Sequence, residues 1–236
     1  MKLFKYTLKL IDPLFYSLEG LSGAVTPKLI HATAINHAIL YVTEKDLESQ
    51  PYLITEDNGG RNTPRYETSF ISQKFYFTPA RLKGNAVYLP EIAKGELDGF
   101  VVKGYPGAEV LRASRLFSIA PESGFEGYGF FIEGFEMPSL IRLGSFRGKA
   151  RLTYEEITFI KGITNELVEH PVDPLVSETI RGVMVNLFPY PLVENAICKS
   201  CLEIRGKESR FSKRISLPVA VKSVNDDPFK EACIIV

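Results

Sequence analysis

The chain opens with a regular alternation of apolar and polar residues. Within the segment of residues 3–11, alternate positions from 4 to 10 are apolar and the positions between them are polar. Successive side chains of a β-strand point to opposite faces, so this pattern predicts a strand with one buried side and one solvent-facing side. The apolar set is Phe4, Tyr6, Leu8 and Leu10, and the polar set is Lys5, Thr7 and Lys9.

A helical period follows this strand. Apolar residues recur at spacings of three and four between residues 27 and 42, which predicts an amphipathic helix. Thr26 is a suitable cap, and Pro27 suits the first helical position because an N–H there would have no partner in the helix. The apolar positions are Leu29, Ala32, Ile35, Ala38, Ile39 and Val42.

Residues 43–106 are less regular than the segments on either side. Glycine, asparagine and proline gather between residues 58 and 66, which indicates a loop. Residues 69–78 and 99–103 have the composition of short strands. We therefore predict that residues 43–106 form an insertion, a protruding hairpin-rich arm.

The rest of the chain has the pattern of strands with one short helix. Residues 123–129 are rich in glycine and predict a turn between two of these strands. Pro138–Leu143 is expected to form the short helix. The predicted strands are residues 108–120, 128–135, 150–160, 178–188, 196–205 and 213–222.

The predicted order up to residue 160 is strand, helix, insertion, strand, strand, short helix, strand. This is the order of a ferredoxin-like β-α-β-β-α-β unit in the α+β class. RNA-recognition modules use the same arrangement. We expect residues 1–170 to form this core, with the arm inserted at about residues 43–106, and residues 171–236 to form a β-rich C-terminal extension packed on it.

Composition narrows the class of protein. The 236 residues include 28 basic and 28 acidic side chains, so the net charge is zero. A free-standing nucleic-acid-binding protein usually has a basic excess, whereas a subunit needs only one basic face. Three cysteines, no membrane-spanning apolar run and no signal peptide predict a cytoplasmic protein without membrane contact.

The segment from residue 140 to residue 151 is the strongest candidate for a binding site. Its glycines allow a sharp turn, its cations and hydroxyl suit phosphates, and its phenylalanine suits stacking on a base. Two interpretations stay open for it, RNA contact and a solvated basic turn. The candidate RNA-binding residues are Arg142, Gly144, Ser145, Phe146, Arg147, Gly148 and Lys149.

Two further groups of residues are weaker candidates. Lys28 and His31 lie near the predicted helix start, where a phosphate is favoured, although a structural role for His31 is the alternative. The arm loop has Arg61, Arg65 and Tyr66, which suit single-stranded RNA or a partner surface, with a solvated loop as the alternative.

No residue pattern indicates catalysis, a metal or another cofactor. His31 and His37 are six residues apart, about 600° around a helix, so they do not share a face. Cys198 and Cys201 form one CxxC pair, but a structural zinc site needs four ligands and the sequence has no second pair. His170 and Cys233 are the only spare candidates. Nucleotide-binding loops, nucleophile elbows and HExxH motifs are absent from the sequence. We therefore expect a protein that is not an enzyme and needs no cofactor.

Four stretches of the chain resemble a known family; they are Tyr6–Tyr16, Pro27–Asn36, Ile141–Lys149 and Val185–Asn195. On these stretches the chain resembles the small RAMP subunit, of the Cas-five type and the Csc-one family, of type I-D CRISPR interference complexes. RAMP proteins have ferredoxin-like units with a glycine-rich loop that contacts RNA. Residues 144–149 lie at the place of that loop, although the loop is short and has Ser145 where many relatives have glycine.

The resemblance implies a role in an antiviral Cascade-type ribonucleoprotein. A subunit of this kind grips the 5′ handle of the guide RNA (crRNA), while its arm contacts the backbone RAMP subunit. The large subunit is the other expected protein partner, and any contact with target DNA is expected to be indirect. Two alternatives stay open: a metal-independent endoribonuclease with His31 or His37 as base, and a purely structural assembly subunit.

Overall fold

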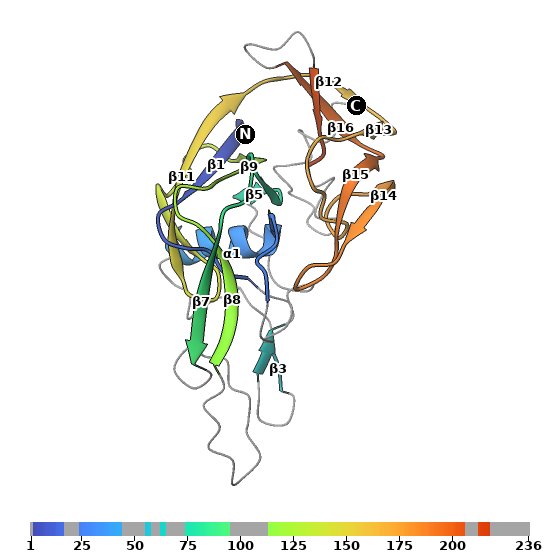
Figure 1. The fold of residues 1–236 in the computed structure, drawn as a ribbon. Coiled ribbons are helices and arrows are strands. Elements are labelled where there is room, and N and C mark those ends of the chain that lie inside the picture. The colour runs from blue at the N-terminus through green and yellow to red at the C-terminus, as the bar shows by residue number, and fades with distance from the viewer. Residues whose placement is uncertain are drawn as a thin grey trace.

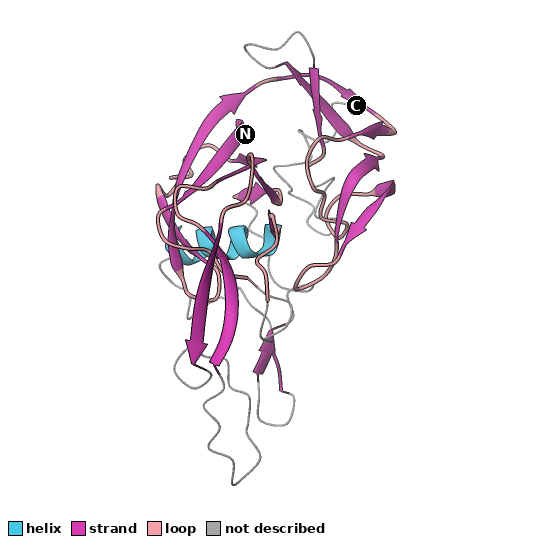
Figure 2. Ribbon diagram, viewed as in Figure 1, coloured by secondary structure: helices cyan, strands magenta, loops and turns pink. Residues whose placement is uncertain are grey.

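The computed structural model describes residues 2–16, 24–43, 55–57, 62–64, 74–94, 113–205 and 212–217, which are mostly β-strand with one helix (Figure 2). No described helix has the length and apolar character needed to cross a membrane. The elements are β1 (Lys2–Leu10), β2 (Leu29–Ile30), α1 (Ala32–Thr43), β3 (Thr55–Asp57), β4 (Asn62–Pro64), β5 (Phe75–Phe77), β6 (Ala80–Leu82), β7 (Tyr88–Lys94), β8 (Ala113–Ile119), β9 (Gly124–Phe131), β10 (Leu140–Leu143), β11 (Gly148–Ile157), β12 (Phe159–Ile163), β13 (Glu166–Leu167), β14 (Thr179–Val185), β15 (Leu192–Cys198), β16 (Cys201–Arg205) and β17 (Ser212–Ile215).

A seven-stranded sheet forms the centre of the fold. Its strand order is β10-β11-β1-β9-β6-β2, and β5 also pairs with β9. Every pairing in it is antiparallel. The strand predicted at residues 3–11 is confirmed as β1, and the strand predicted at 150–160 is confirmed as β11. These two strands lie side by side over most of their length.

One face of this sheet is apolar and packs against α1, which lies across it in Figure 1. Phe4, Tyr6 and Leu8 of β1 are fully buried there. The neighbouring strand β9 accommodates their rings because it has glycine at the facing positions. A Cβ at Gly127 would lie 2.5 Å from Tyr6 Oη, and one at Gly129 would lie 2.6 Å from Phe4 Cζ. The alternation in the sequence therefore sets which side of the sheet receives the helix.

The opposite face of the sheet is covered only in part. At one end Leu3, Tyr76, Tyr128 and Phe130 form an apolar cluster with residues of the C-terminal strands β16 and β17. The alternate positions nearer the other end of β1 and β11 are polar or charged. We call this partly covered side the open face. The C-terminal strands thus cover one end of the open face and leave the end at β10 and β11 exposed.

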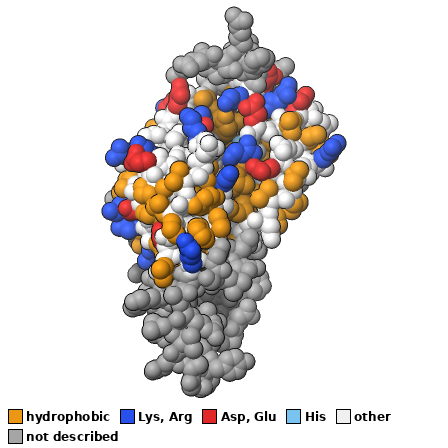
Figure 3. Space-filling model, in the orientation of Figure 1, with side chains coloured by type: hydrophobic (Ala, Val, Ile, Leu, Met, Phe, Trp, Pro, Cys, Tyr) orange, Lys and Arg blue, Asp and Glu red, His pale blue; other side chains and the backbone are white. Residues whose placement is uncertain are grey.

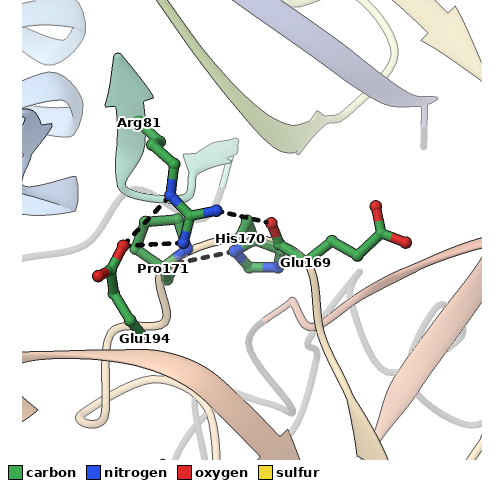
Figure 4. Close-up of polar contacts among 5 residues, drawn as sticks. All are labelled: Arg81, Glu169, His170, Pro171 and Glu194. Carbon is green, nitrogen blue, oxygen red and sulfur yellow. Dashed lines mark hydrogen bonds and ion pairs between the residues drawn. The ribbon is translucent and has the colours of Figure 1, made fainter. Parts of the chain in front are cut away.

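Polar contacts also hold the C-terminal strands to the sheet (Figure 4). The Arg81 guanidinium on β6 donates two hydrogen bonds to one carboxylate oxygen of Glu194, at 3.2 and 2.8 Å, and a third, at 3.5 Å, to the Glu169 carbonyl. His170 Nε2 accepts a hydrogen bond from the Ser216 backbone N–H at 3.0 Å. Its Nδ1 therefore has the proton and donates to the Pro171 carbonyl at 2.8 Å.

The segment predicted as an inserted arm is divided between the sheet and a projection. Within residues 43–106, strands β5 and β6 pair with β9 in the central sheet. The hairpin of β7 and β8 projects away from it, and β3 pairs with β4 in a second small hairpin (Figure 1). The predicted strand at residues 99–103 lies outside the described residues. The boundary at residue 170 stays a prediction.

The predicted helix at residues 27–42 begins later than expected. Residues 29 and 30 form β2 and pair with β6, so the helix starts at Ala32. Thr26 is not its cap, because its hydroxyl donates to the Leu14 carbonyl (3.2 Å) and accepts from the Tyr16 N–H (3.3 Å). The pairing of β2 outweighs the local signal of a threonine followed by a proline.

The short helix predicted at residues 138–143 is wrong. Residues 140–143 form the edge strand β10, with Ile141 and Leu143 buried and Leu140 and Arg142 exposed. The turn predicted at residues 123–129 is also wrong, since β9 begins at residue 124. The strand predicted at residues 196–205 is divided between β15 and β16. The described chain is thus a mostly β structure with a curled sheet and one helix.

Gly129→Ala is expected to destabilise the fold, because the added methyl group would meet Phe4 Cζ at 2.6 Å and would lie still closer to the Tyr76 carbonyl oxygen. Overpacking of this kind costs about 1–3 kcal/mol in the free energy of unfolding, measurable by urea denaturation. Gly124→Ala is the control in the same strand, because a Cβ there has no atom within 4 Å. Equal stability of the two variants would contradict the packing described here.

His170 is expected to make the fold sensitive to acid. Burial lowers the pKa of His170 to about 4 from its ordinary 6.5, so between these values the unfolded chain binds a proton that the folded chain does not. The stability present at neutral pH is therefore lost as the pH falls from 6.5 towards 4. His170→Asn should reduce this loss by up to roughly 3 kcal/mol, measured by denaturation between pH 4 and 8.

Comparing wild type with the His170→Asn variant isolates the effect of His170 on stability. Burial raises the pKa of Asp173 to about 6, which has the opposite effect on stability, but it does so in both proteins. The difference between the two stability curves therefore reports His170. Parallel curves from pH 8 to pH 4 would show that protonation of His170 does not oppose folding.

Candidate nucleic-acid interface

The basic loop predicted as a binding site is a tight turn between β10 and β11. Gly144 and Arg147 both have positive φ, at 78° and 52°. The Ser145 N–H donates to the Phe15 carbonyl at 2.9 Å. A Cβ at residue 144 would lie 2.7 Å from that same carbonyl oxygen. Glycine is thus required at residue 144 by the packing of the chain on itself, whatever else the loop binds.

Phe146 anchors this turn. Its ring stacks on Phe15 with the centroids 5.3 Å apart and the planes 20° apart. Both rings belong to a small apolar cluster with Leu116. The sequence suggested that Phe146 stacks on a base, but Phe15 occupies one face of its ring. Phe146 therefore helps to hold the loop in place, and its stacking on a base stays a prediction.

Two pairs of like charges face each other across the strands beside this turn. Arg142 on β10 lies directly opposite Lys149 on β11. Lys9 on β1 lies directly opposite Arg151 on β11. All four side chains are exposed on the open face. The Cβ atoms of directly opposite residues are about 5 Å apart, and like charges in such pairs destabilise a sheet.

We call the five cations on and beside this turn the basic patch; they are Lys9, Arg142, Arg147, Lys149 and Arg151. Lys9 pairs with Glu122. None of the described carboxylates pairs with the other four side chains. The Arg142 guanidinium instead donates to the Arg147 carbonyl at 3.3 Å, and Asp12 accepts from the backbone N–H of Lys149 at 2.9 Å. The patch is therefore an accumulation of positive charge.

Two other lysines near the open face are neutralised by one carboxylate. Lys5 and Lys83 both lie 3.0 Å from the Glu126 carboxylate. Burial opposes ionisation of Glu126, but hydrogen bonds from both lysines lower the pKa of its carboxyl. On the face of the molecule shown in Figure 3, cationic and acidic side chains likewise lie close to one another. The basic patch differs from these surroundings, and its charge suits an anionic ligand.

A comparison with known protein families identifies the family of the chain. The family model of the type I-D CRISPR-associated protein Cas5/Csc1 matches residues 1–226. The chain belongs to this family. The resemblance read from the sequence is thereby confirmed, and membership implies a place in a CRISPR complex. No curated protein matches the chain.

In this Cas5/Csc1 family member, Lys28 and His31 do not join the basic patch. Lys28 is exposed beside β2, whereas the patch lies at the β10 edge of the same sheet. His31 is 4% exposed, and burial lowers the pKa of its imidazole to about 4. Its Nδ1 accepts the Thr33 N–H at 3.1 Å, which makes His31 the N-terminal cap of α1. The imidazole thus has a structural role at the start of α1, and its contact with a phosphate stays a prediction.

The remaining candidates have different outcomes. Arg61, Arg65 and Tyr66 lie outside the described residues, so their part in arm contacts stays a prediction. Cys198 and Cys201 are free and buried. Among the described residues, no group of histidine, cysteine or acidic side chains is arranged to hold a metal.

Sequence reasoning missed Lys9 and Arg151 as members of the patch. Arg151 is two residues from Lys149 on the same strand, and the strand period places both on one face. That signal was present in the sequence. The contribution of Lys9 was not, because it depends on the register between β1 and β11, which are far apart in the chain.

Arg142→Glu is expected to stabilise the isolated protein in the absence of RNA, because it replaces a like-charged pair by an ion pair with Lys149. Cross-strand pairs of opposite charge contribute about 0.2–1 kcal/mol, and salt screens this gain. Urea denaturation at low and high salt measures it, with Arg142→Gln as the control that only removes the repulsion. A variant less stable than wild type at low salt would show that the pair is not repulsive.

Proposed function

We propose that the protein is a non-catalytic subunit of a type I-D CRISPR surveillance complex that grips the 5′ handle of the guide RNA with its basic patch. The observation that supports this most directly is the like-charged pair of Arg142 and Lys149, which lies beside Arg151 on β11. Such pairs weaken a free protein, and a phosphate between them removes the repulsion.

The chemistry of the patch favours contacts with phosphates. Arginine and lysine bind phosphate oxygens through charge-assisted hydrogen bonds. Ser145 is exposed at the turn and can add a hydroxyl donor. Phosphate contacts fix the register of an RNA without reading its bases. We therefore propose that the patch positions the guide RNA and that base recognition lies elsewhere.

The central sheet supports a relation to the ferredoxin-like RAMP fold. The four strands β11, β1, β9 and β5 or β6 lie in the spatial order of the fourth, first, third and second strands of a β-α-β-β-α-β unit. In this interpretation β10 takes the place of the second helix, and the turn at residues 144–147 lies where the RNA-binding loop of RAMP proteins lies.

A binding role accounts for the histidines better than catalysis does. Burial lowers the pKa of both His31 and His37, and His31 caps α1. A general base needs access to the proton that it removes. We propose that neither residue cleaves RNA.

We further propose that the projecting hairpin of β7 and β8 contacts the backbone subunit. The large subunit is the other proposed protein partner, and the proposed complex acts in the cytoplasm.

Replacing Arg142, Arg147 and Lys149 together by alanine should weaken binding of handle RNA. If each residue meets one phosphate, the slope of log affinity against log salt should become shallower by about 2, at roughly 0.7 per contact for a single strand. The measurement is a salt titration of RNA binding by the assembled complex. The loss should be similar for altered handle sequences, because phosphates are common to all of them.

The matched control replaces Lys2, Lys83 and Lys199 by alanine. It removes the same net charge, but each of these lysines already has a carboxylate partner. The control should keep both the affinity and the slope of wild type. If the two triple variants behave alike, general charge drives binding and the basic patch is not the site.

A further inference from the structure

Strand β14 is exposed along most of its length. It lies at the edge of a three-stranded sheet whose order is β13-β15-β14. Its central residues are exposed on both faces of the strand, including Ile180 (53%), Val183 (58%) and Met184 (61%). Large apolar side chains on both faces of an edge strand are unusual in a protein that acts alone.

The backbone of β14 is also available on one side. One edge pairs with β15, with shifts of register between Thr179 and Arg181 and between Arg181 and Val183, and no described strand pairs with the other edge. Figure 1 shows β14 at the outer side of the C-terminal strands, away from β11 and its basic patch. Its outer edge therefore presents backbone donors and acceptors to a further strand.

The strand is held firmly enough to act as a template. Gly182 packs so closely on β15 that a Cβ there would overlap the Val193 side chain and lie 3.1 Å from the Glu194 carbonyl oxygen. Glu194 in turn binds Arg81 of the central sheet. β14 is thus connected through β15 to the core of the protein.

The charge on β14 indicates what kind of strand fits it. Arg181 is exposed and has no carboxylate partner among the described residues. A partner must therefore supply apolar side chains for Val183 and Met184 and an acidic one for Arg181. RNA does not meet the first requirement, because its phosphates leave the apolar side chains without contacts.

A second copy of this chain does not meet the requirements either. Two β14 strands paired antiparallel about Gly182 would bring the two Arg181 residues close together. They would repel each other, and neither would gain a carboxylate.

We propose that β14 is a docking strand for an extended segment of another protein subunit of the CRISPR complex. That segment adds to the free edge, places apolar side chains on Val183 and Met184, and has an acidic residue opposite Arg181. Strand addition of this kind gains affinity from backbone hydrogen bonds and specificity from alternate side chains. This inference rests on family membership and is independent of RNA binding at the basic patch.

Hydrogen–deuterium exchange of the full chain, alone and in the reconstituted complex, tests the backbone pairing. The amides of residues 179–185 are expected to exchange at least about tenfold more slowly in the complex, because new inter-strand hydrogen bonds protect them. Unchanged exchange would overturn the proposal. A photo-crosslinking residue at position 184 should then join another protein subunit of that complex. A crosslink to RNA or to a second copy would overturn the choice of partner.

Substitutions test the side-chain requirements. Met184→Lys should reduce incorporation into the complex by about tenfold or more, because a buried lysine has no partner there. Arg181→Glu should reduce it more than Arg181→Gln. Ile160→Lys is the matched control, since Ile160 is 49% exposed on β12, an edge strand of another sheet. Incorporation of Met184→Lys at the level of this control would also overturn the proposal.

Two further measurements separate this inference from the proposed function. Thermal unfolding of each variant should match wild type, because the substituted side chains are exposed. RNA affinity of Met184→Lys should be unchanged, whereas the triple alanine variant of the basic patch should lose RNA and keep the protection of β14. Loss of β14 protection in that triple variant would overturn the independence of the two surfaces.

Discussion

The alternation of side chains along β1 is the constraint on which the rest of the structure depends. Its apolar set packs under α1, and its polar set faces the other way. Because β11 and β9 pair with β1 in register, their own alternation follows the same two sides. A shift of one residue would turn every apolar side chain towards solvent. Both the core and the basic patch thus depend on one register.

The two ends of the open face differ, because one is packed against the C-terminal strands and the other is charged. At one end the C-terminal strands cover an apolar cluster that includes Leu3 and Phe130. At the other end, like charges accumulate on β10 and β11 without described acidic partners. The first end stabilises the fold, and the second costs stability in the free protein. A negatively charged ligand would offset this loss of stability, because it would supply the missing partner.

The C-terminal strands are attached by contacts of different kinds. Arg81 binds Glu194 at the surface, whereas the buried His170 lies against Tyr128 of β9, with the ring centroids 5.7 Å apart. A third contact lies at the start of α1, where Tyr190 donates to the buried Asp173 at 2.8 Å and packs edge-on against His31 at 4.4 Å. These contacts fix β15 on the sheet and leave β14 at its outer side.

The sequence by itself determined the strongest features. Patterns in the sequence predicted the alternation of β1, a strand at residues 150–160, one amphipathic helix, the cations of the loop and the family of the chain. Each of these signals spans many residues or several stretches. Averaging over such a length makes the pattern stronger than the competing local preferences.

Tertiary structure decided the short segments and the composition of the site. Pro138–Leu143 has too few residues to favour helix or strand by itself, and pairing with β11 made it a strand. Pairing of β2 with β6 likewise moved the start of α1 to the cap at His31. Lys9 joined the patch, and Phe146 turned to Phe15, through residues distant in sequence. Contacts of this kind are set by long-range register and packing, which local propensity does not specify.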